Sequence, residues 1–240
     1  MSMAMKDTRE PVIRIEGLSK SFVLHNQGGV ELPVFRDIDL EVFAGECLAL
    51  HGPSGTGKSS LIRLIYGNYL CPQGRILIRH DGRITDIARA QPHEILDLRR
   101  RIMGYVSQFL RVIPRVPALQ VVAEPLRAQG VDAAAAEQAA GEMLARFNIP
   151  ERLWHLAPAT FSGGEQQRVN LARGFIVDYP ILLVDEPTAS LDKANRDVVI
   201  DVIGQAAARG AAVVGIFHDA QMRDAVATRV LDLAPAGAAA

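Results

Sequence analysis

Residues 52–60, with the sequence GPSGTGKSS, constrain the fold more than any other part of the chain. They match the pattern G-x-x-x-x-G-K-[ST] and lie between ECLAL, which is typical of a strand, and SLIRLIYG, which is typical of a helix. Glycines at these positions let the backbone curl, so that successive N–H groups and the positive end of the helix face one point. The sequence therefore predicts a phosphate-binding loop between a strand and a helix.

Lys58 and Ser59 give this loop its chemistry. We expect Lys58 to reach the β- and γ-phosphates of a nucleotide and the Ser59 hydroxyl to ligate Mg²⁺. A glycine-rich turn can also be only a tight connection between a strand and a helix, with no ligand. The Lys and Ser that follow the glycines disfavour this alternative. The other loop residues that we expect to contact the nucleotide are Gly52, Pro53, Ser54, Gly55, Thr56, Gly57 and Ser60.

Short apolar runs alternate with longer helical patterns along most of the chain. The strand-like runs are VIRI, ECLALHG, RILIRH, IMGYVSQ, ILLVDEP, AAVVGIFHD and RVLDL. This alternation predicts an α/β fold with a largely parallel sheet covered by helices on both faces. The strand signal disappears between YVSQ and ILLVDEP, where Asp132 is placed to cap AAAAEQAAGEMLARF. We expect a helical insertion there and a disordered tail, PAGAAA.

Composition limits the possible partners and locations. The chain has 240 residues and a net charge of −1, so nothing indicates a nucleic-acid-binding surface. The start lacks the apolar core of a signal peptide, and no apolar run approaches the roughly 18 residues of a membrane span. We therefore expect one cytoplasmic domain that does not itself enter a membrane. The two cysteines, Cys47 and Cys71, have neither a disulfide nor a metal-ligand spacing.

The run PILLVDEP places two carboxylates, Asp185 and Glu186, at the end of an apolar strand. Ligands of open α/β sheets bind at such carboxyl ends. Many strands end in solvated charges, but beside a phosphate loop the pair has separable tasks. We expect Asp185 to hold the magnesium shell and Glu186 to act as general base on the attacking water.

The stretch 161–175, FSGGEQQRVNLARGF, begins a second helix with Ser162, Gly163 and Gly164. These residues repeat the logic of the phosphate loop, with exposed N–H groups and a hydroxyl at a helix start. The spacing allows three interpretations: a second anion site, a simple helix cap, or a cradle for a nucleotide held by another copy. The residues alone do not choose among them.

Together these motifs resemble the nucleotide-binding domain of ABC ATPases over nearly the whole chain. The resemblance rests on the phosphate loop, Gln108 in YVSQF, the signature from Ser162 to Gln166, Asp185 with Glu186, SLD at 190–192, and His218 in IFHD. It implies a P-loop ABC ATPase domain with a mainly parallel core sheet, an antiparallel β subdomain and a helical insertion. It also implies a single domain over 1–240, with its core in 10–108 and 175–235, its helical subdomain in about 109–174 and a disordered tail in 236–240.

The resemblance implies that two such domains, in a homodimer or a heterodimer with a related ABC ATPase, enclose ATP and Mg²⁺. Gln108 would then sense Mg²⁺ and the attacking water, His218 would contact the γ-phosphate, and Asp192 would help to form the dimer contact. The family's adenine-stacking aromatic, often Tyr, corresponds to Phe22 in LSKSF, for which core packing is the alternative. The usual Ser-Gly-Gly-Gln signature has Glu165 here, an extra carboxylate that we expect to weaken closure.

Longer stretches are similar to ABC subunits of the bacterial phosphonate carbon–phosphorus lyase system, including SQFLRVIPRVPAL, whose residues after Gln108 the ATPase motifs do not dictate. This implies soluble lyase core subunits as partners, contacted through Phe109, Leu110, Arg111, Val112, Ile113 and Arg115; a loop that covers its own core is the alternative. Two separated cysteines do not hold the lyase's iron–sulfur cluster. Two other functions stay open: the motor of a membrane transporter, and a nucleotide-dependent structural subunit with little turnover.

Overall fold

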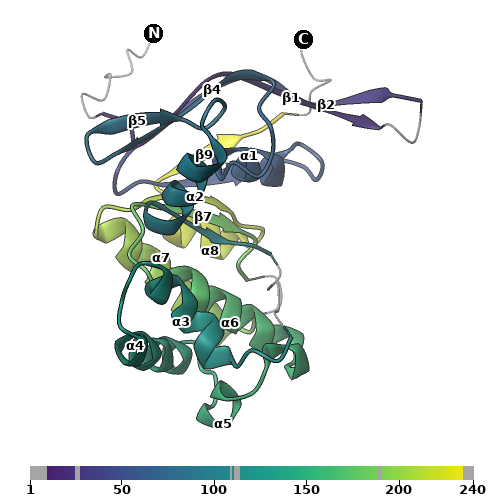
Figure 1. Ribbon diagram of the computed structural model, residues 1–240. Helices are drawn as coiled ribbons and strands as arrows, with labels where there is room; N and C mark the ends of the chain where they lie inside the picture. Colours follow the sequence, from purple (N-terminus) through teal and green to yellow (C-terminus); the bar gives the residue numbers. More distant parts are fainter. Residues whose placement is uncertain (1–9, 25–27, 109, 111–113, 189–190, 235–240) are drawn as a thin grey trace.

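The computed structural model describes residues 10–24, 28–108, 110, 114–188 and 191–234 and arranges them around two sheets (Figure 1). The strands are β1 (Ile13–Leu24), β2 (Val30–Val42), β3 (Cys47–His51), β4 (Gln73–His80), β5 (Arg83–Asp86), β6 (Met103–Val106), β7 (Ile181–Asp185), β8 (Ala212–Ile216) and β9 (Arg229–Asp232). The helices are α1 (Lys58–Ile65), α2 (Pro92–Arg101), α3 (Ala118–Ala128), α4 (Ala133–Arg146), α5 (Glu151–Trp154), α6 (Gly163–Phe175), α7 (Lys193–Ala208) and α8 (Ala220–Val226), with a 3₁₀ turn at Pro158–Thr160.

The larger sheet is parallel and has the strand order β6-β7-β8-β3-β9. Along β3, Leu48 and Leu50 belong to one apolar cluster, whereas Cys47 and Ala49 belong to another on the opposite face. Because both faces are buried, β3, β7 and β8 are buried along nearly their whole length rather than alternating, as predicted for a sheet covered on both sides, whereas the edge strand β9 is mostly exposed. The carboxyl ends of β3 and β7 lie at the same edge, which brings the phosphate loop close to Asp185.

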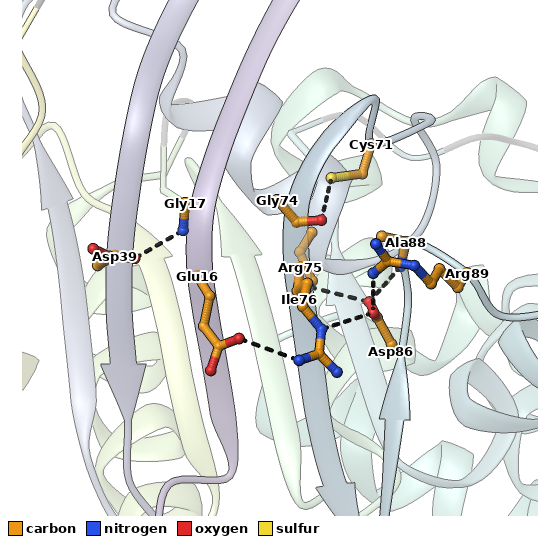
Figure 2. Close-up of polar contacts among 10 residues, drawn as sticks. All are labelled: Glu16, Gly17, Asp39, Cys71, Gly74, Arg75, Ile76, Asp86, Ala88 and Arg89. Carbon is orange, nitrogen blue, oxygen red and sulfur yellow. Dashed lines mark hydrogen bonds and ion pairs between the residues drawn. The ribbon is translucent and has the colours of Figure 1, made fainter.

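The smaller sheet is antiparallel, in the order β2-β1-β4-β5, which confirms the antiparallel part of the expected fold. Polar contacts link its strands (Figure 2). The Gly17 amide donates to Asp39 at 2.8 Å, and Arg75 lies between Glu16, at 3.5 Å, and Asp86, at 3.3 Å. These contacts fix neighbouring strands in one register. The strand-like runs read from the sequence did not include β2 or β5.

The interval without strand signals contains α3 to α6, which lie at the end of the molecule opposite the antiparallel sheet (Figure 1). Asp132 caps α4 as predicted, accepting from the Ala134 amide at 2.9 Å. On the apolar side of α4, Leu144 and the following Phe147 are buried, and the Phe147 ring stacks 6.4 Å from the Phe175 ring of α6. The helical insertion thus has its own packed centre, while the domain boundaries given above stay predictions.

Two sequence-based expectations concern the C-terminal tail and membrane-spanning segments. The tail at 236–240 lies outside the described residues. Within the described ranges, no helix is long and apolar enough to cross a membrane.

Candidate nucleotide site

The phosphate loop joins β3 to α1 through glycines that no other residue can replace without strain. Gly52 has φ +134° and Gly57 has φ +89°, which L side chains rarely adopt. A Cβ at Gly52 would lie 2.5 Å from the Leu233 carbonyl oxygen, and one at Gly57 would lie 2.3 Å from Val34 Cγ1. The curled backbone that the sequence predicts is therefore present, and Gly57 is the N-cap residue directly before α1.

Lys58 is buried against this loop, with 8% of the residue exposed. Its Nζ donates to the carbonyl oxygens of Gly52, at 2.7 Å, and Pro53, at 2.8 Å. Both acceptors are neutral, so they leave the full positive charge of the ammonium available to a phosphate. The Thr56 hydroxyl is instead bonded inside the loop, to the Pro53 carbonyl at 3.0 Å, whereas Ser54 and Gly55 are exposed.

Ser59 and Asp185 meet across 126 positions of sequence. The Ser59 hydroxyl donates to Asp185 Oδ1 at 3.0 Å, and Asp185 is only 1% exposed. Burial raises the pKa of Asp185, while the Ser59 hydrogen bond lowers it. Hydroxyl and carboxylate oxygens are ligands that Mg²⁺ prefers, and they lie beside a loop that fits phosphates. The donor set therefore fits a magnesium–nucleotide complex.

Glu186 follows directly and holds two other predicted residues. Its carboxylate accepts from Gln108 Nε2 at 2.8 Å and lies 2.6 Å from His218 Nε2. Because a carboxylate only accepts, the His218 nitrogen that faces it carries the proton. Glu186 has φ +52°, an uncommon backbone conformation for a non-glycine residue, and such conformations occur at active sites as well as in turns. The three residues expected to handle water and the γ-phosphate are thus in direct contact.

The signature Ser162 caps α6 in a reciprocal box with Glu165. The Ser162 hydroxyl donates to Glu165 Oε2 at 2.7 Å, the Ser162 amide donates to the same oxygen at 2.9 Å, and the Glu165 amide donates back to Ser162 Oγ at 3.3 Å. The hydrogen bond from the Ser162 hydroxyl lowers the pKa of Glu165, which is therefore charged at neutral pH. The Ser162 hydroxyl thus already has an acceptor in Glu165. The role of Ser162, Gly163 and Gly164 as a cradle for a nucleotide stays a prediction.

Phe22 and Asp192 lie outside the cluster around Glu186. Phe22 is partly exposed on β1 and belongs to neither apolar cluster of the described residues, which argues against core packing. The Tyr69 ring meets it edge-on at 5.5 Å, and Lys20 Nζ lies 4.9 Å from its centroid. Exposed Asp192 caps α7 by accepting from the Asn195 amide at 2.9 Å. Adenine stacking and the dimer contact stay predictions, and Ser190 lies outside the described residues.

The segment after Gln108 is described only in part. Phe109, Arg111, Val112 and Ile113 lie outside the described residues, so their contact role stays a prediction. Leu110 packs against the apolar cluster around the helical insertion, whereas Arg115 is exposed with φ +66°.

Two buried polar residues of α6 were missed by the sequence analysis. Gln167 Nε2 donates to the Pro187 carbonyl at 3.0 Å, and Asn170 Nδ2 donates to the Ser107 carbonyl at 2.6 Å. Each residue is 5% exposed. They connect the signature helix to the neighbours of Glu186 and Gln108. Their signal in the sequence is a pair of amides three positions apart, which lie on one face of a helix.

Comparison with known proteins gives consistent results. A family model described as ABC transporter matches residues 35–189. An uncharacterized ABC transporter ATP-binding protein of Mycobacterium tuberculosis is 38% identical over 213 residues, which are 89% of this chain and 63% of that relative. The lipoprotein-releasing system ATP-binding protein LolD of Novosphingobium aromaticivorans is 38% identical over 195 residues, which are 80% of this chain and 82% of the relative.

A third relative and a solved structure extend the comparison. The macrolide export ATP-binding/permease protein MacB of Paracoccus denitrificans is 34% identical over 230 residues, which are 96% of this chain and 33% of that protein. A dimeric post-hydrolysis structure of the ATP-binding cassette MJ0796, bound to ADP and Pi, matches with a TM-score of 0.84 at 26% identity. The match covers 93% of this chain and 95% of the solved chain.

The fold and the nucleotide site define an ATP-binding cassette ATPase with ATP and Mg²⁺ as its cofactors. The chain belongs to the ABC transporter family. It spans 63% of the length of the mycobacterial relative and a third of MacB. The activities of those longer proteins are therefore carried over to this chain only as proposals.

Proposed function

We propose that the chain is the ATP-hydrolysing subunit of a larger assembly and converts ATP-driven closure of a dimer into movement of a partner. The observation that carries this proposal is Glu186, held between Gln108 at 2.8 Å and His218 at 2.6 Å beside the buried Asp185. When bound, Mg²⁺ offsets negative charge on the β- and γ-phosphates. Glu186 takes a proton from water that Gln108 orients, His218 donates to the γ-phosphate, and Lys58 neutralises its charge.

The proposed active unit contains two cassettes, either identical or related. Ser162 caps α6 at an exposed position, where a nucleotide held by a second cassette can reach it. The likeness to the dimeric cassette MJ0796 with ADP and Pi supports this arrangement. One ATP would then lie between the phosphate loop of one copy and the signature of the other. Closure on ATP and opening after hydrolysis supply the movement.

The partner that the comparisons support best is a membrane permease. LolD is named as part of a lipoprotein-releasing system, and MacB is named as both ATP-binding protein and permease. A groove of about 380 Å³ between the parallel sheet and the helical insertion offers a docking site, lined in part by Tyr66, Arg99, Glu124, Arg173 and Tyr179. Within it Arg173 pairs with Glu124 at 2.9 Å, so the groove presents both charges and aromatic rings to an incoming segment.

A second candidate partner is the soluble core of the phosphonate carbon–phosphorus lyase. What favours it is the resemblance stated in the sequence analysis, which includes SQFLRVIPRVPAL and the run from NIPERLWHLAPATF to the signature, whereas the relatives reported above are transporter proteins. The site's chemistry is the same for either partner, because both need ATP-dependent closure. The two candidates differ in what should copurify with the chain.

The test is affinity purification of the tagged Glu186→Gln variant with ATP and Mg²⁺, from cells using methylphosphonate as the only phosphorus source. Lys58→Ala is the matched control, because it should not hold the nucleotide. Copurification of an integral membrane protein supports the permease, whereas copurification of soluble lyase subunits supports the second candidate. A variant that keeps its biological activity although it no longer hydrolyses ATP would instead identify a structural subunit and contradict the motor.

A further inference from the structure

Asp185 has a second anchor, Tyr105, to which the sequence analysis gave no role of its own. Its Oδ1 accepts from Ser59, while the Tyr105 hydroxyl donates to Oδ2 at 3.3 Å. On the parallel sheet Tyr105 of β6 pairs with Leu183 of β7, two positions before Asp185. Residues two apart on a strand lie on the same face, so the Tyr105 ring and the Asp185 carboxylate are both on the α1 side of the sheet. Each carboxylate oxygen is therefore held by a hydroxyl.

Arg63 connects this pair to the phosphate-loop helix. It lies four residues after Ser59 on α1, so both side chains lie on the same face of that helix. Hydrogen bonds to Tyr69 and then Tyr105 raise the pKa of Arg63. A tyrosine hydroxyl accepts and donates at once. Arg63 is therefore close enough to Tyr105 for its charge to act on the hydroxyl that donates to Asp185 at 3.3 Å, which makes that hydroxyl a stronger donor.

The same guanidinium reaches the aromatic end of the site. Arg63 Nη1 donates to the Tyr69 hydroxyl at 3.0 Å, and the Tyr69 ring meets Phe22 edge-on at 5.5 Å. A continuous set of contacts thus runs from Phe22 through Tyr69, Arg63 and Tyr105 to Asp185. It joins the residue expected at the adenine to the carboxylate expected at the magnesium.

We propose that Tyr105 and Arg63 are positioning residues that fix the Asp185 carboxylate for Mg²⁺ and connect it to the aromatic cluster at Phe22. This inference rests on the proposed function, because it assigns the pair a task at the same nucleotide site. The pair orients Asp185 and leaves the phosphate contacts of Lys58 unchanged. Its loss should therefore weaken the contribution of magnesium to nucleotide binding without weakening metal-free binding.

The experiment measures the dissociation constant of a fluorescent, non-hydrolysable ATP analogue by anisotropy, once with EDTA and once with Mg²⁺. The ratio of the two constants is the magnesium enhancement, and Mn²⁺ binding to the nucleotide complex, followed by EPR, reports the metal directly. Tyr105→Phe keeps the ring 4.9 Å from Tyr66 and removes only the hydroxyl. Tyr66→Phe is the matched control, because its hydroxyl makes no hydrogen bond to Asp185 among the described residues.

We expect Tyr105→Phe to lower the magnesium enhancement and the Mn²⁺ affinity about tenfold, as for loss of a hydrogen bond to a charged group, with the EDTA constant unchanged. Arg63→Met should also lower the magnesium enhancement and the Mn²⁺ affinity. The double variant should be little worse than the more strongly affected single variant, because the two residues act through one carboxylate. Tyr69→Phe, which removes one of the two anchors of Arg63, should cost about two- to threefold.

Several outcomes overturn the inference. An unchanged enhancement in Tyr105→Phe removes the positioning role, and an equal loss with EDTA and with Mg²⁺ shows a merely structural one. Full additivity of Arg63→Met and Tyr105→Phe breaks the proposed connection between them. If the unaltered chain binds no nucleotide under either condition, the proposed function itself fails, and this result is distinct from the others.

Discussion

Replacing Glu165 by Gln should tighten the ATP-bound dimer, because Glu165 holds the hydroxyl of the signature serine. The Ser162 hydroxyl donates to the charged Glu165 carboxylate at 2.7 Å and must leave it before it can donate to a phosphate. A hydrogen bond to a charged group contributes about 1.5–3 kcal/mol and one to a neutral amide about 0.5–1.5 kcal/mol. Since Ser162 is exposed, the difference belongs at the low end, about 1 kcal/mol at each site.

Two signatures act in one dimer, so the expected gain is about 2 kcal/mol, or roughly 30-fold in the dimerisation constant. The fold should be little affected, since Gln at this position also completes a capping box. Loss of the charge at the helix start costs about 0.3–1 kcal/mol and lowers Tm by about 3 °C at most.

Sedimentation equilibrium in the Glu186→Gln background, with ATP and Mg²⁺, gives the dimerisation constant with and without Glu165→Gln. Glu142→Gln is the control, because it removes the same charge from an exposed position on α4. A dimer no tighter than that of the control would refute the reasoning. It would show that the capping box does not compete with the nucleotide.

Three further predictions concern separate parts of the molecule. Asp86→Asn should lower the free energy of unfolding at neutral pH by about 1–3 kcal/mol in urea titrations, because the carboxylate accepts from Arg89, Ile76 and Ala88 (Figure 2). Burial alone would raise the pKa of Asp86, but these hydrogen bonds lower it in the folded protein. The contribution of Asp86 to the free energy of unfolding is therefore complete above the ordinary Asp pKa and is lost as pH falls through the lower folded value. The variant should lack this acid-dependent loss of stability, and a pH profile identical to that of the unaltered chain would contradict the assignment. Asn170→Ala should reduce kcat several-fold with little change in the KM for ATP, because it removes the hydrogen bond from Asn170 to the Ser107 carbonyl beside Gln108, and an unchanged steady-state kcat would remove this role. Arg111→Glu with Arg115→Glu should spare ATPase activity and weaken capture of the partner in the affinity purification, and an intact complex would show that the segment is not a contact surface.

Local signals in the sequence were sufficient for the parts of the site that lie within one stretch of chain. The phosphate loop is such a part, since its strand, glycines and helix are consecutive and their geometry depends on Gly52 and Gly57 themselves. The Asp132 cap of α4 is another. Strand β2 was missed because Pro33 interrupts it and most of its residues are exposed. A sheet tolerates such a proline in an edge strand, and β2 is the edge strand of the antiparallel sheet.

Contacts between distant segments carried no comparable signal. Glu186 meets His218, 32 positions away, and Gln108, 78 positions away, and the motif order indicates their roles but not their hydrogen bonds. Tyr105 was part of a predicted strand, where an aromatic residue is expected to pack in the core. Only the pairing of β6 with β7 places its hydroxyl against Asp185, so its role required the structure.

The most direct test of the account measures the mass of the Glu186→Gln variant by light scattering after size exclusion, with and without ATP and Mg²⁺. The account predicts a monomer without nucleotide and a dimer holding two ATP molecules with it. It also predicts that adding Ser162→Arg keeps ATP bound at Lys58 but abolishes the dimer. A chain that binds ATP and stays monomeric, or a dimer that Ser162→Arg leaves intact, would contradict the shared ATP site.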